Sequence, residues 1–155
     1  MDEYYFIVKI TVSGRRFFLI WNAEYESVFL TDDKKDILVF TNLFNLTSYA
    51  KTKGIDLDYR ITPYDLDNIT VTVETLDCKE IVEKWNIISD LALTAGLEFS
   101  GEDKRYNAIY DKLFFGCNLP TMKHHSYTPE WSAEEIAEIN RILAEGAELC
   151  RHVLM

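Results

Sequence analysis

The order of hydrophobic patterns along the chain constrains its fold most strongly. Alternating, strand-like patterns dominate the first 73 residues, and helical patterns dominate the rest. Strands that are separated in sequence from helices are typical of α+β proteins, in which helices pack on a mostly antiparallel sheet. We therefore expect an α+β fold, with a mixed, mainly antiparallel sheet of about five strands and about four helices packed on one face of it.

Five segments have the pattern of strands. In residues 4–12 every second side chain from Tyr4 to Val12 is apolar, whereas Lys9 and Thr11 lie on the opposite face. Ser13-Gly14 predicts a tight turn into the next strand. Residues 55–68 are predicted to be irregular, with Pro63 as a breaker. The predicted strands are residues 4–12, 16–21, 28–30, 37–40 and 69–73.

Four helices are predicted from capping residues and apolar spacing. Thr41 or Asn42 begins the first, which ends at Gly54; Asp77 begins the second, which ends at Gly96. The third begins at Ser100 and stops at Gly116, and the last begins at Ser132, which forms a capping box with Glu135. The connection from strand 37–40 through the first helix to strand 69–73 is long enough for a crossover, and it indicates one parallel pair.

Length and composition indicate one domain over residues 1–155. The chain is 48% hydrophobic, which is enough for a substantial core, and it has no internal repeat. The N-terminal residues lack the basic region of a secretory signal, and no run approaches the roughly 18–20 apolar residues of a membrane helix. Three widely spaced cysteines (Cys78, Cys117 and Cys150) favour a cytoplasmic protein with reduced, buried thiols.

The chain is strongly acidic. Its 26 Asp and Glu residues exceed its 16 Lys and Arg residues, which gives a formal charge of −10. Such a charge repels nucleic acid and anionic membranes and attracts basic partners. We therefore expect a basic protein as partner, and neither nucleic acid nor a membrane.

The sequence has no recognisable catalytic or metal-binding motif. It contains no glycine-rich phosphate loop, nucleophile elbow or paired cysteines at zinc-binding spacing. His124 and His125 are adjacent in the loop of residues 116–131, and adjacent histidines in an extended loop point in different directions. We expect no catalytic residue, no metal and no cofactor.

The predicted contact surface lies in residues 56–67, where four aspartates alternate with tyrosine and leucine. Aspartates attract a basic surface over a distance, and tyrosine supplies rigid contact area. The other interpretation is a solvated loop whose tyrosines and leucines fold back onto the core. The loop of residues 118–128 is the second candidate. The predicted partner-binding residues are Asp56, Asp58, Tyr59, Tyr64, Asp65 and Asp67.

The segments ILVFTNLFNLTSYA, WNIISDLALTAG and YDKLFFGCNLP, together with the small size and acidity, resemble the immunity proteins of bacterial toxin–immunity systems, including those of contact-dependent growth inhibition. The resemblance implies a cytoplasmic, non-enzymatic protein that binds a cognate toxin domain, most often a nuclease, and blocks its active site. An acidic surface can occupy a cleft that otherwise binds phosphates.

Two other classes of function stay open. The first is a small enzyme that uses Cys117 and His124, although Cys117 follows a helix C-terminus, where the helix dipole disfavours a thiolate. The second is an adaptor subunit of a larger assembly, which the surplus of aromatic residues would suit.

Overall fold

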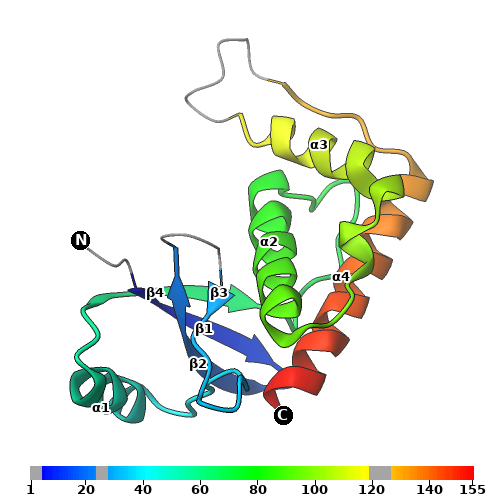
Figure 1. The fold of residues 1–155 in the computed structure, drawn as a ribbon. Helices are drawn as coiled ribbons and strands as arrows, with labels where there is room; N and C mark the ends of the chain where they lie inside the picture. The colour runs from blue at the N-terminus through cyan, green and yellow to red at the C-terminus, as the bar shows by residue number, and fades with distance from the viewer. Residues whose placement is uncertain (1–4, 24–27, 119–126) are drawn as a thin grey trace.

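The computed structural model describes residues 5–23, 28–118 and 127–155. In these residues a four-stranded sheet has the order β3-β2-β1-β4 (Figure 1). Strand β2 is antiparallel to β1 and to β3, whereas β4 is parallel to β1. The α+β prediction and the mixed, mainly antiparallel sheet are confirmed, but the described residues form four strands, not five. The strands are β1 Tyr5–Val12, β2 Arg15–Asn22, β3 Val28–Phe29 and β4 Leu57–Asp65.

The hairpin of β1 and β2 is the centre of the sheet. Val12 pairs with Arg15, so only Ser13 and Gly14 form the turn. Both have positive φ, 54° and 69°, as a two-residue hairpin turn of the type that matches the twist of the strands requires. The predicted turn and the predicted alternation of β1 are therefore correct.

The two faces of the sheet have separate hydrophobic cores. Val8, Ile10 and Val12 of β1 belong to the larger core, which lies under α2 (Cys78–Ala95) and α4 (Ala133–Leu154). Ile7 and Ile20 belong to the smaller core on the other face, which α1 (Leu43–Lys53) covers. Helices thus cover both faces, and the prediction that they pack on one face is wrong. Helix α1 lies apart from α2 and α4 (Figure 1).

Helices α2 and α4 approach each other closely. Gly146 of α4 faces Ile88 of α2, and a Cβ atom at position 146 would lie 2.5 Å from Ile88 Cδ1. Only glycine permits this approach without a shift of the buried Ile88 side chain. Helix α3 (Asn107–Gly116) packs on α2 of this pair, farther from the sheet (Figure 1).

The capping residues correctly predict three of the four helices. The Asn42 side chain accepts a hydrogen bond from Asn45 N at the start of α1, and Gly54 ends that helix with φ of 68°. Asp77 caps α2, and Ser132 with Glu135 forms the capping box of α4. The predicted third helix is divided: two short 3-10 turns, Ser100–Glu102 and Lys104–Tyr106, precede α3.

The prediction of strands at residues 37–40 and 69–73 is wrong. In residues 37–40 only two isolated bridges form, Phe40 with Phe18 and Ile37 with Thr31. Residues 69–73 pair with no strand, because the backbone N–H and C=O of Val71 bond to the side chain of Asn140 on α4, at 2.8 Å and 2.9 Å.

The strand that was missed is β4, in the segment predicted to be irregular. It is an edge strand, and its register against β1 shifts between Asp58 and Ile61, which makes Tyr59 and Arg60 a bulge. Pro63 is tolerated because an edge strand can lack one N–H donor. The parallel pair therefore exists but joins β1 to β4, not strand 37–40 to strand 69–73.

No helix among the described residues is both long and apolar enough to cross a membrane.

Candidate functional site

The predicted contact segment, residues 56–67, forms β4 and the turn that follows it, and most of its aspartates bond within the chain. Asp58 holds Arg60 through two hydrogen-bonded nitrogens, the closer at 2.7 Å, and these bonds lower the pKa of Asp58 to about 2. Asp65 accepts hydrogen bonds from Asn68 and from Asp67 N, and its pKa is lowered mainly by the Asn68 side chain.

Asp67 supports the central hairpin. Its two carboxylate oxygens accept hydrogen bonds from Ser13 N at 2.6 Å and Gly14 N at 2.9 Å. These are the backbone amides of the β1–β2 turn, so Asp67 fastens the end of β4 to that turn. These hydrogen bonds give Asp67 a structural role in the fold, which accounts for an aspartate at this position without a binding partner.

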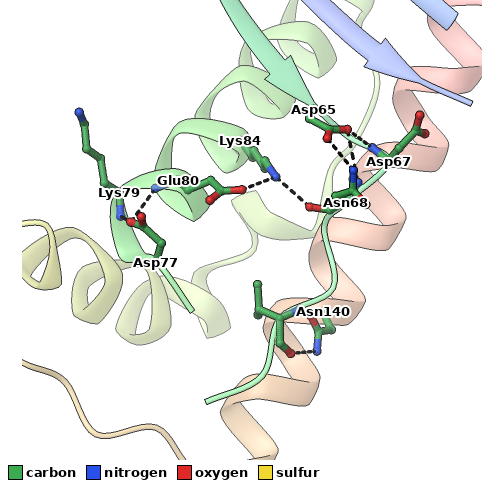
Figure 2. Close-up of polar contacts among 9 residues, drawn as sticks. Asp65, Asp67, Asn68, Asp77, Lys79, Glu80, Lys84 and Asn140 are labelled. Atoms are coloured by element: carbon green, nitrogen blue, oxygen red, sulfur yellow. Dashed lines mark hydrogen bonds and ion pairs between the residues drawn. The ribbon is translucent and has the colours of Figure 1, made fainter. Parts of the chain in front are cut away.

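A buried lysine fastens the same turn to α2. Lys84 is 6% exposed, and Figure 2 shows its ammonium between Glu80 and the carbonyl of Asn68. Lys84 Nζ donates to Glu80 Oε1 at 2.8 Å and to Asn68 O at 3.0 Å. The residues 65–68 are therefore held in place from two sides, by Asp67 and by Lys84.

The remaining predicted contact residues lie on different sides of β4. Asp56 is exposed, and Tyr59 in the bulge is 74% exposed. Tyr64 is half-buried and lines a cavity between the sheet and α2. The six residues do not form one surface, and Tyr64 connects them to a second candidate site. The alternative loop, residues 118–128, lies mostly outside the described residues.

This cavity, the Trp21 pocket, has a volume of about 450 Å³. It brings together Trp21 from β2, Tyr64 from β4, and the exposed side of α2. Its polar and aromatic lining consists of Trp21, Tyr64, Glu83, Asn86, Ser89, Asp90 and Glu102. This lining contains no basic residue, so all of its charged side chains are acidic.

A second hollow of about 840 Å³, the acidic groove, continues from the pocket, because Ser89, Asp90 and Glu102 line both. It runs between the C-terminal half of α2 and residues 97–105. Its charged lining is five carboxylates and one guanidinium, from Asp90, Glu98, Glu102, Asp103, Glu145 and Arg105.

Asp90 lies where the pocket and the groove meet, and its carboxyl is half-buried. Burial raises its pKa from 3.8 to about 6, and the negative charge of Glu102 adds to the rise. The Trp21 indole N–H opposes it, since it is close enough to favour the carboxylate. The pKa of the Tyr64 hydroxyl is also raised, mainly by burial and further by the negative charges of Glu83 and Asp90.

Three buried polar atoms along these hollows have no hydrogen-bond partner of normal geometry. They are Trp21 Nε1, Ser89 Oγ and Ser100 Oγ, and within the described part of the chain no other buried side-chain nitrogen or oxygen shares this property. Buried polar groups are ordinarily paired, so each exception needs an explanation. The residues that carry these atoms, Trp21, Ser89 and Ser100, all line the pocket or the groove.

The cysteine site predicted as an alternative has an unfavourable environment for a nucleophile. Burial raises the pKa of both Cys78 and Cys117, and the charge of Asp77 raises it further in both. The Cys117 thiol donates to Leu113 O at 3.4 Å. A raised pKa lowers the fraction of reactive thiolate. His124 and His125 lie outside the described residues, and among those described no three His, Cys, Asp or Glu side chains are grouped to hold a metal.

Sequence patterns miss the pocket because its members come from distant segments. Asp90 carries the one available signal: it follows Ile87 and Ile88 and precedes Leu91 in a helix that buries most of its circumference. A carboxylate in such a position is forced to be partly buried. Trp21 and Glu102 give no comparable signal in sequence.

Comparisons with known proteins identify the fold alone. No family model matches the chain, and no curated protein matches it. Among solved structures, the crystal structure of the SatS C-terminal domain in complex with bromine is similar, with a TM-score of 0.61. The match covers 97% of this chain and 92% of that one at 13% sequence identity. At this identity the likeness supports the architecture and carries no site residue.

Proposed function

We propose that the chain is an acidic binding protein that neutralises a basic protein partner, a toxin nuclease domain, by occupying its cleft. The observation that carries the proposal is the acidic groove, in which five carboxylates accompany one arginine. Besides the half-buried Asp90, two of the carboxylates, Glu98 and Glu102, form no ion pair in the described part of the chain. Their charge is therefore available to a partner.

The physical basis is substitution of one anion for another. A nuclease cleft is lined by basic side chains that bind phosphates, and a row of fixed carboxylates can bind the same side chains. The protein needs no catalytic group of its own for this purpose. Its net charge of −10 also accelerates the encounter with a basic domain.

The edge of the sheet offers a second set of contacts. Asp56 and Tyr59 are exposed and remain predicted contact residues, whereas Asp58, Asp65 and Asp67 are engaged in bonds within the chain. The three cysteines are free thiols, which suits the expected cytoplasmic location, where such an inhibitor would meet its toxin.

The test is to mix the protein with the toxin domain encoded beside its gene and to measure the dissociation constant by calorimetry across a salt series. Between about 50 mM and about 500 mM NaCl we expect the affinity to fall about tenfold or more, since salt screens exposed charges. Nuclease activity of the domain should fall in parallel with complex formation.

A matched pair of variants locates the effect. The test pair, Glu98→Gln with Glu102→Gln, removes two charges from the groove. The control pair must remove two charges outside the groove, and it leaves Asp32 unchanged because Asp32 accepts hydrogen bonds from Lys34 N and Asp36 N. Asp33→Asn with Glu74→Gln removes two exposed charges that belong neither to the groove nor to the predicted contact residues. Equal loss of affinity in both pairs would contradict a role for the groove, and an affinity independent of salt would contradict electrostatic docking.

A further inference from the structure

We propose that the Trp21 pocket is a binding site for one arginine side chain of the basic partner, inserted between the rings of Trp21 and Tyr64 and the carboxylates of α2. This inference rests on the proposed function, because it assumes that the partner presents basic side chains to this face. It adds a defined pocket and a defined chemical group to a general acidic surface.

The first step of the argument is the composition of the pocket. Carboxylates of Glu83, Asp90 and Glu102 and the rings of Trp21 and Tyr64 line a volume of about 450 Å³. Pockets for small ligands span roughly 300–1,000 Å³, so the space suits one long side chain. Aromatic faces and carboxylates both attract cations, and aromatic faces hold the flat guanidinium especially well.

The second step is the supply of hydrogen-bond acceptors. A guanidinium has five N–H donors and no acceptor. The pocket offers three carboxylates, and the buried hydroxyl of Ser89 has no partner among the described residues. Glu83 makes only a long ion pair, 3.8 Å to Lys79, at the surface. An arginine would therefore find the Glu102 carboxylate and the Ser89 hydroxyl without a partner in the described chain, beside the carboxylates of Glu83 and Asp90.

The third step is the state of the pocket when it is empty. Half-burial and the neighbouring Glu102 disfavour the charged form of Asp90, and no ion pair to a described residue compensates. An inserted cation would supply the missing countercharge. The affinity for arginine should therefore increase between about pH 5 and about pH 7, as Asp90 loses its proton. The other charged and titratable groups that line the pocket with Asp90 are Glu83, Glu102 and Tyr64.

The experiment uses the full chain, labelled with ¹⁵N, and follows the indole N–H signal of Trp21 by NMR, assigned with the Trp21→Phe variant. The probe is Nα-acetyl-arginine amide, and the control is the matching citrulline derivative, which has nearly the same shape without the charge. We expect a saturable shift of the Trp21 signal with the arginine probe, with a dissociation constant on the order of millimolar, as for a single side chain. The citrulline probe should cause no saturable shift.

Variants test the assignment to the pocket. Asp90→Asn should weaken binding of the arginine probe about fivefold or more, and Glu102→Gln, at an exposed position that does not endanger folding, should weaken it in the same direction. Asp33→Asn removes one exposed charge outside the pocket and should leave the constant unchanged. Equal weakening by Asp33→Asn would overturn the proposal, because it would reduce the effect to net charge.

Two further outcomes would also overturn it: a Trp21 signal that does not move with the arginine probe, or a citrulline probe that binds equally well. Tighter binding of spermidine than of an arginine-bearing peptide would assign the pocket to free polyamines instead of a protein side chain. Failure of the proposed function would give a different result from failure of the arginine site. If no basic domain binds but the arginine probe still saturates the pocket, the site stands and the inhibitor hypothesis falls.

Discussion

At the scale of single residues, the fate of the four aspartates in residues 56–67 shows why charge alone does not identify a binding surface. Asp58 holds Arg60, Asp65 holds Asn68, and Asp67 bonds to the turn between β1 and β2. Asp67 and the turn amides are more than 50 residues apart in sequence, so no local pattern predicts the bond. The sequence does not distinguish an aspartate that accepts hydrogen bonds from backbone amides from one that is free to bind another protein.

Asp90 provides a prediction about pH. Its pKa is raised to about 6 in the folded protein from 3.8, so the folded state binds a proton more tightly than the unfolded state does. Stability from this group is therefore complete at about pH 4 and is lost as the pH rises through about 6. One pKa unit corresponds to about 1.4 kcal/mol, but a half-exposed group is screened by water, so we expect a net cost of about 1 kcal/mol at pH 7.

We therefore expect Asp90→Asn to increase the free energy of unfolding at pH 7 by about 1 kcal/mol and to have little effect near pH 4. Urea unfolding followed by circular dichroism at several pH values checks this. Asp33→Asn, an exposed neutralisation, is the control for net charge. A variant at position 90 that is less stable than the natural protein at pH 7 would show that the carboxylate stabilises the fold.

At the scale of elements, the segments 57–65 and 69–73 reverse the prediction from sequence. Residues 69–73 have the β-branched alternation of a strand, yet Val71 bonds to Asn140 of α4, and Ile69 and Val71 pack on the large core. Residues 57–65 contain a proline and a two-residue bulge, yet they pair with β1. Propensity describes how a segment fits a half-buried sheet, whereas the available partner decides which segment enters it.

Asn140 is therefore expected to matter more than a surface asparagine. Its amide nitrogen donates to Val71 O and its amide oxygen accepts from Val71 N, and both contacts are partly buried (Figure 2). Asn140→Ala leaves both backbone groups without these partners and should lower the free energy of unfolding by about 1–3 kcal/mol. Urea unfolding measures the difference.

The control for Asn140→Ala is Glu134→Ala, at an exposed position of the same helix. We expect it to cost less than about 1 kcal/mol, the effect of one charge in the first turn. Amide hydrogen exchange gives a second measurement: Val71 N–H should be protected in the natural protein and should lose protection in the variant at position 140. Unchanged exchange would mean that Asn140 does not hold the segment.

At the scale of the whole molecule, the net charge of −10 on 155 residues should oppose folding through repulsion in the compact state. Salt screens this repulsion. Raising NaCl from about 0.05 M to about 0.5 M should therefore increase the free energy of unfolding by on the order of 1 kcal/mol. Urea unfolding at each salt concentration checks it, and KCl should act equally at equal ionic strength. A fall in stability with salt would mean that favourable ion pairs outweigh the repulsion.

The sequence predicts the architecture of this molecule better than its site. Caps such as Asn42 and Ser132 and the alternation in β1 depend on neighbours in sequence, so they predict three helices and the central hairpin. The Trp21 pocket depends on the meeting of β2, β4 and α2, and it forms only after the chain has folded. The predicted segment 56–67 contributes Tyr64 to it, which is the one point where the sequence hypothesis and the pocket coincide.

The central position of β1 has a consequence for synthesis on the ribosome. Of the described strands, β1 leaves the exit tunnel before the others, and it can form a hairpin with β2 at once, but its other edge stays open until β4 has emerged. The apolar face under α4 stays uncovered still longer, until residues 133–154 are translated. A nascent chain therefore exposes apolar surface until α4 has been translated, and ribosome-associated chaperones should bind it until α4 docks.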